Sequence, residues 1–119
     1  MNRLPQTHDG TRGSFHSLTV ADFDNDGDLD IYTMEQQDID ILPEGLGPRG
    51  YLWENMDGKG GGFTEHVIFD KNLGGHDALA GDMDADGDID IAFKIWEKWS
   101  NSAIGATFHA DWLENQTKN

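Results

Sequence analysis

The chain of 119 residues has about the length of one ordinary domain, which is enough to bury a modest core. Its formal net charge is −15, from 23 acidic and 8 basic residues, which argues against nucleic acid or an anionic membrane surface as a partner, because both require a cationic face. The absence of cysteine excludes disulfides and thiolate metal sites. A hydrophobic content of 36% with 15 glycines favours a turn-rich, all-β globular fold over disorder.

A shift of the sequence by sixty residues brings two copies of one pattern into register. Segments 22–31 and 82–91 read DFDNDGDLDI and DMDADGDIDI, His16 aligns with His76, and LWEN at 52–55 aligns with WLEN at 112–115. Coincidence readily produces one Asp-rich match, but it rarely places a second, unrelated motif at the same offset. The sequence therefore predicts an N-terminal arm at 1–13, a first repeat at 14–73 and a second repeat at 74–119.

Short strands separated by turns are predicted in both repeats. In chain order the first repeat is expected to form strands at 16–21, 30–34, 51–56 and 63–69, and the second at 76–81, 90–95 and 108–114. The four residues after Asn115 are too few for a counterpart of the strand at 63–69, so the second repeat is expected to lack its last strand. The connections 35–50 and 97–107 are expected to be surface loops, because they contain Pro, Gly, Ser and Asn.

The two acidic loops, 22–30 and 82–90, carry carboxylates at positions 1, 3, 5 and 9 and glycine at position 6. Several oxygen ligands on a tightly turning backbone are what a hard cation requires. Alternation is expected to place Asp22, Asp24 and Asp26 on the inner side of the first loop, and Gly27 permits the sharp bend. Asp28 is expected to contribute its backbone carbonyl while its side chain points outward, and Asp30 completes the shell. In the second loop the bend falls to Gly87, and the same roles fall to Asp82, Asp84, Asp86, Asp88 and Asp90.

Calcium is the ion that these loops predict. Magnesium keeps more of its waters, and transition metals favour His or Cys ligands. An EF-hand is excluded, since position 12 is Thr33 in one copy and Phe93 in the other and the flanking segments are typical of strands. A solvated turn is the simpler interpretation of one such loop, and two loops in register make it much weaker.

Together these motifs resemble the FG-GAP or VCBS-type repeat of integrin-like β-propellers, from about residue 14 to residue 115. The resemblance implies an all-β fold of two four-stranded antiparallel propeller-type blades, the second incomplete, with Ca²⁺ bound between the first two strands of each. The implied ligands are Asp22, Asp24, Asp26, Asp28, Asp30, Asp82, Asp84, Asp86, Asp88 and Asp90. A clear Phe-Gly…Gly-Ala-Pro segment is absent, as it is from the looser VCBS-type repeats.

Propellers usually contain four to eight blades, so two blades cannot close a ring. The chain is therefore expected to be part of a longer propeller or to form a homo-oligomer. The missing strand suggests that the second repeat accepts a strand from another chain, supplied by the N-terminal arm or the segment around Phe15.

The remaining candidate residues are histidines and aromatics. His16 and His76 recur six residues before each loop, and we expect them to pin strand to loop through a hydrogen bond. His109 and Asp111 form a weak candidate acid–base pair. Trp53 and Trp112 are expected in the core between blades. Trp96 and Trp99 are candidate glycan contacts, because aromatic rings beside polar loop residues stack on sugars, although covering the blade edge is the more ordinary role.

Two functions compete on this basis. The first is a calcium-stiffened structural or recognition module for adhesion or for binding a carbohydrate or protein ligand. The second is a propeller segment of a polysaccharide-degrading, lyase-like enzyme, which needs a basic rim. Few basic residues stand out (Arg49, Lys94 and Lys98), so the first and non-enzymatic function is preferred.

The calcium loops also indicate a location outside the cell. Sites built from single loops usually need calcium well above cytosolic levels, so an extracellular or cell-surface location is expected. Residues 1–10 lack the basic and apolar regions of a signal peptide, and none is expected there. No apolar run is long enough to span a membrane, and no insertion is expected.

Overall fold

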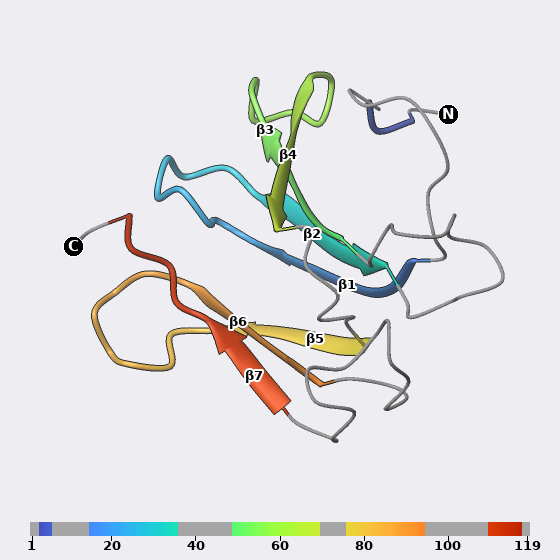
Figure 1. Ribbon diagram of the computed structural model, residues 1–119. Helices are drawn as coiled ribbons and strands as arrows, with labels where there is room; N and C mark the ends of the chain where they lie inside the picture. The colour runs from blue at the N-terminus through green and yellow to red at the C-terminus, as the bar shows by residue number, and fades with distance from the viewer. Residues whose placement is uncertain (1–2, 6–14, 36–48, 70–75, 95–109, 118–119) are drawn as a thin grey trace, which may run out of the picture.

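The computed structural model describes residues 3–5, 15–35, 49–69, 76–94 and 110–117 (Figure 1). These parts of the chain contain seven strands and no helix. The strands are β1 (Phe15–Ala21), β2 (Asp30–Glu35), β3 (Gly50–Asn55), β4 (Phe63–Phe69), β5 (His76–Gly81), β6 (Asp90–Lys94) and β7 (Ala110–Leu113). The prediction of an all-β fold is confirmed, and each strand begins and ends within two residues of its expected boundary. No helix in these ranges is long and apolar enough to cross a membrane.

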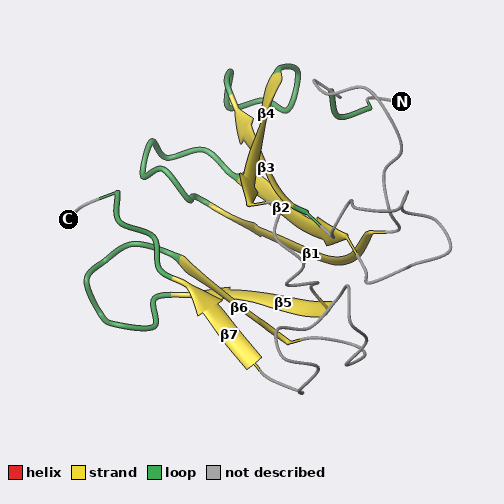
Figure 2. Cartoon of the chain, in the orientation of Figure 1, coloured by secondary structure: helices red, strands yellow, loops and turns green. Residues whose placement is uncertain are grey.

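The strands form two open antiparallel sheets, one with the order β1-β2-β3-β4 and one with the order β5-β6-β7 (Figure 2). Ala21 lies opposite Asp30 in the first sheet, and Gly81 lies opposite Asp90 in the second. Each acidic loop therefore closes the first hairpin of its sheet. Both loops project from the same end of the two sheets, because β1 and β5 lie side by side and run in the same direction (Figure 1).

The hydrophobic core lies between the two sheets. Tyr32 and Met34 alternate with outward residues along β2 and are fully buried, as period-two side-chain alternation requires. Opposite them, Ile91 and Phe93 of β6 are 5% and 4% exposed. The complete buried cluster is Phe23, Tyr32, Met34, Ala78, Ile91 and Phe93.

The second sheet is stacked on the first in the same orientation. The two sheets are not related by a twofold axis, which would bring equivalent faces together. Ile91 faces the first sheet, whereas its equivalent in the repeat, Ile31, pairs with Val20 and Trp53 on the face of the first sheet that points away from the second. The internal contact is therefore formed by two different faces of one repeated unit. One face of each unit is left without the other sheet against it.

The outward face of the first sheet is anchored by a buried ion pair. Arg49 Nε lies 2.6 Å from Glu35 Oε1, its second nitrogen lies 3.3 Å from Oε2, and the Tyr51 hydroxyl donates to Oε1 at 2.8 Å. The forked geometry satisfies both oxygens of a carboxylate that is fully buried. Trp53 stacks on Tyr51 at 5.4 Å and donates its Nε1–H to the Pro5 carbonyl at 3.1 Å.

The expectation that Trp53 and Trp112 both pack between the two units is wrong. Trp53 is buried, but on the outward face of the first sheet, where Phe15 meets its ring edge-on at 5.8 Å. Trp112 is 46% exposed, because it pairs with Ala92 on the face of the second sheet that has no neighbour among the described residues. Sequence periodicity gives the alternation of these residues, but not which face is covered.

Candidate metal centre

The first acidic loop is held in shape by its own backbone. The N–H groups of Asp26 and Gly27 donate to the two carboxylate oxygens of Asp22 at 3.1 and 2.9 Å. Asn25 and Gly27 adopt left-handed backbone conformations, with φ of 62° and 96°, which Asn and Gly tolerate best. These turns wrap the chain around the carboxylate at position 1.

The second loop repeats this geometry almost atom for atom. The corresponding N–H groups of Asp86 and Gly87 donate to Asp82 at 3.1 and 3.0 Å, and Ala85 and Gly87 have φ of 64° and 95°. The two loops differ in sequence only at their second, fourth and eighth residues. Their common shape therefore comes from the shared aspartates and glycine.

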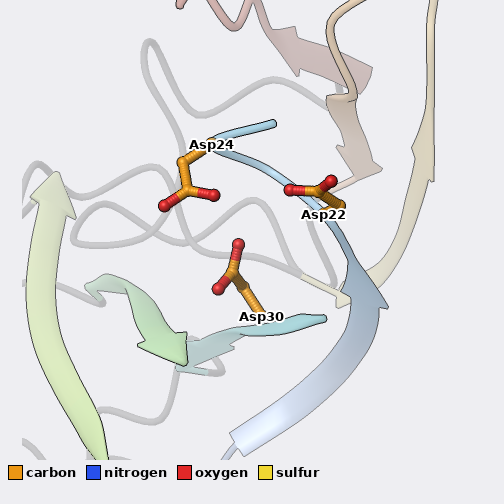
Figure 3. Close-up of side chains that lie close together, drawn as sticks. All are labelled: Asp22, Asp24 and Asp30. Atoms are coloured by element: carbon orange, nitrogen blue, oxygen red, sulfur yellow. The ribbon is translucent and has the colours of Figure 1, made fainter. Parts of the chain in front are cut away.

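Three carboxylates converge in each loop. In the first they come from Asp22, Asp24 and Asp30, and one oxygen from each lies within 4.8 Å of the others (Figure 3). In the second they come from Asp82, Asp84 and Asp86. Two oxygens that each contact one Ca²⁺ at about 2.3–2.6 Å are separated by up to roughly 5 Å, so this spacing suits a shared cation. Both groups can hold a metal ion.

The expected ligand set is only partly gathered. Asp26 is not part of the first group, and Asp90 is not part of the second. Asp26 Oδ1 instead accepts the N–H of Asp28 at 2.8 Å, which closes the following turn. Asp86 makes the equivalent bond to Asp88 N at 2.9 Å and still reaches the group.

The aspartate at position 9 ties each loop to its sheet. Asp30 is fully buried and accepts the N–H of Phe23 at 3.0 Å and that of Asn55 at 2.9 Å. Asp90 does the same with Met83 and Asn115, both at 2.8 Å. The asparagine side chains also bond to the loops, from Asn55 Nδ2 to the Leu29 carbonyl at 3.2 Å and from Asn115 Nδ2 to the Ile89 carbonyl at 3.1 Å, which explains why an asparagine recurs at the same offset as the loops.

The aspartate at position 7 stays outside both groups, and its side chain meets other parts of the protein. Asp88 is fully buried and accepts the side-chain N–H of Asn25 at 2.8 Å, which joins the two loops. Asp28 lies against the β3–β4 turn, where a Cβ on Gly58 would come 2.5 Å from its Oδ1. Both side chains were expected to point outward, but that of Asp88 is fully buried, and neither contact was expected.

Two asparagines link the units and were missed from the sequence. Asn25 makes the contact with Asp88, and Asn115 Nδ2 donates to the Phe23 carbonyl at 2.6 Å as well as to the Ile89 carbonyl at 3.1 Å. The first loop has Asn where the second has Ala85. This difference between the repeats was the available signal. A contact between consecutive units uses a given position in only one of the two repeats, so that position can differ between them.

Crowding alters the acidity of these groups. Burial, together with repulsion from Asp30 and Asp26, raises the pKa of Asp24 from 3.8 to about 6, although a hydrogen bond from the Asp26 backbone opposes the rise. Burial and the charges of Asp86 and Asp90 likewise raise the pKa of Asp84. Ionised carboxylates at this spacing are therefore costly without a cation.

Trp96, Trp99 and His109 lie outside the described residues. Asp111 is described and is exposed on β7. No family model, no curated protein and no solved structure matches this chain.

The raised pKa of Asp24 predicts a pH-dependent penalty on the metal-free fold. Because the pKa is higher in the folded chain than its ordinary 3.8, ionisation opposes folding, and the penalty grows as the pH rises from 3.8 through about 6. Asp24→Asn should therefore gain stability relative to the wild type over this range in chelator. Urea unfolding of both proteins across the range measures the difference. Saturating calcium should abolish or reverse it, and a difference that does not change with pH in chelator would contradict the assignment.

Proposed function

We propose that the chain is a calcium-binding structural module built from two FG-GAP/VCBS-type blades. The observation that carries the proposal is that two loops with different variable residues hold their first aspartate by the same backbone N–H groups, and that three carboxylates converge in each loop. Loops that served only as solvated turns would have no need for a carboxylate at alternate positions in both copies.

Calcium fits the donors better than other common cations. The groups contain only carboxylate oxygens, with no His or Cys among them, which disfavours zinc and copper. Their loops are short and glycine-containing, and such loops tolerate the larger and more variable shell of Ca²⁺ better than the strict octahedron of Mg²⁺. Main-chain carbonyls and water complete the shell in this proposal.

The ion would act as a cross-link inside each blade. The aspartate at position 9 joins the loop to β3 in the first blade and to the segment after β7 in the second, through bonds to Asn55 and Asn115. An ion held by the loop therefore restrains the whole sheet. Binding to the folded chain alone stabilises it by RT ln(1 + [Ca²⁺]/Kd), about 2.7 kcal/mol at one hundred times Kd.

The exposed faces support further blades beyond these two. The outward face of the first sheet exposes Leu18 (65%) and Val20 (46%), and their equivalents, Ala78 and Ala80, lie in or against the core between the sheets. The outward face of the second sheet exposes Leu79 (68%) and Trp112 (46%). Each unit thus exposes to solvent an apolar face, and the equivalent face of the other unit is buried in the core between the two sheets. We propose that another copy, or more of a longer chain, covers these faces.

An extracellular or cell-surface setting follows from the proposed ion. Single-loop sites without a rigid cage bind weakly enough to need the calcium concentration outside cells. We propose adhesion or ligand recognition as the biological use of the module.

Calcium titration tests the loops individually. Isothermal calorimetry of the wild type should show two sites, while Asp22→Asn and Asp82→Asn should each weaken one site by roughly tenfold or more, because each removes a ligand charge. Asp111→Asn, which removes the same charge from exposed β7, is the matched control and should leave both sites unchanged. Equal binding by all four proteins would refute the assignment of the loops.

The exposed apolar faces predict self-association. Light scattering should give a mass above the 13.2 kDa of one chain, rising with concentration. Trp112→Glu should shift the protein toward the monomer, since it places a charge on the outward face of the second sheet, whereas Asp111→Asn on the neighbouring residue should not. A compact monomer at every concentration would contradict assembly from copies of this chain.

A further inference from the structure

A pair of histidines lies between the two units, at the end of the sheets away from the acidic loops. His16 in β1 and His76 at the start of β5 occupy equivalent positions of the repeat. Their ring centroids are 5.2 Å apart and their planes are tilted by 31°. The expected role, a hydrogen bond from each histidine to its own loop, does not account for this meeting of the two rings.

The distance between the rings suits a shared metal ion. With Zn–N bonds of about 2.0–2.1 Å and tetrahedral angles, two imidazoles on one zinc have their centroids roughly 5 Å apart. Imidazole nitrogen is a preferred ligand for zinc, copper and nickel and a poor one for calcium. The pair therefore selects a class of ion different from that of the acidic loops.

A carboxylate is positioned beside the second ring by an unusual backbone. Asp77 Oδ1 lies 3.3 Å from His76 Nδ1. Asp77 has φ of 54°, a conformation rare for a residue other than Gly, Asn or Asp, at the point where the pairing of β5 with β6 becomes irregular. A carboxylate on one ring nitrogen is the usual partner of a metal-binding histidine, because it fixes the ring and leaves the other nitrogen for the ion.

Lys94 defines the role of that carboxylate. Its ammonium lies 3.3 Å from Asp77 Oδ2, so the second oxygen is engaged and Asp77 orients the ring instead of joining the ion.

Space for the remaining ligands is present at the pair. A hollow of about 430 Å³ is lined by His16, Ser17, Leu18, Asp77, Ala78 and Leu79. Water or a small anionic ligand can enter it and complete a four-coordinate shell.

We propose that His16 and His76 together bind one zinc-class divalent ion that joins the two units, with Asp77 as the positioning residue for His76. The site would add a second cross-link, between the units, to the calcium cross-links proposed within each one. It depends on neither acidic loop for its ligands.

Cobalt and zinc titrations in saturating calcium test the proposal, because calcium occupies the acidic loops and leaves the histidines free. The wild type should bind one Zn²⁺ per chain by calorimetry and give visible cobalt bands of a nitrogen- and oxygen-ligated ion. His16→Gln and His76→Gln should each weaken binding at least tenfold, and Asp77→Asn by about tenfold. Calcium binding by the same variants should be unchanged.

His66→Gln is the matched control, since His66 is a half-exposed histidine on β4 that pairs with Glu54 at 2.8 Å. It should bind zinc as the wild type does. Absence of zinc binding by the wild type, or undiminished binding by His16→Gln, would overturn the proposal. His16 is exposed, so its replacement is expected to fold, and circular dichroism verifies that. The loop variants Asp22→Asn and Asp82→Asn should lose calcium binding and keep zinc binding. The two sites are therefore tested separately, and failure of the proposed calcium function can be told apart from failure of the histidine site.

Discussion

Electrostatic repulsion among carboxylates in each acidic loop is the constraint on which the rest of the structure depends. Five aspartates lie within nine residues, and backbone N–H groups hold the first of them in one orientation by donating to both of its oxygens. That rigidity prevents the side chains from separating to relieve their repulsion. A cation bound there would convert the same arrangement from a cost into a stabilising contact.

The loops matter to the whole fold because they are joined to it at three levels. Within each hairpin they connect the first two strands, and the buried aspartate at position 9 extends the connection to an asparagine at or just beyond the end of the third strand. Between the units, the hydrogen bond from Asn25 to Asp88 and that from Asn115 to the Phe23 carbonyl join the same region. A modest core between two small open sheets is thus supplemented by polar links at the acidic loops.

Much of this was predictable, since the sequence repeats itself. The sixty-residue offset located both loops, and alternation of apolar and polar residues located the strands. The convergence of Asp22, Asp24 and Asp30 followed from the spacing of the motif. These features depend on residues that are near one another along the chain or within one hairpin.

Features that depend on how one unit lies on the other were not predictable in this way. The burial of Asp88, the exposure of Trp112 and the meeting of His16 with His76 all result from stacking in the same sense. Two identical patterns are equally compatible with a twofold arrangement, in which other faces would meet. Only the packing decides between them, and it makes equivalent residues, such as Leu18 and Ala78, differ in exposure.

Thermal unfolding with calcium and with chelator tests the central claim most directly. If a cation offsets the repulsion in both loops, the melting temperature should rise by several degrees on addition of calcium and rise further as its concentration increases, because the ion binds only the folded chain. A melting temperature that is the same in calcium and in chelator would show that the loops keep their shape without an ion and would contradict the claim.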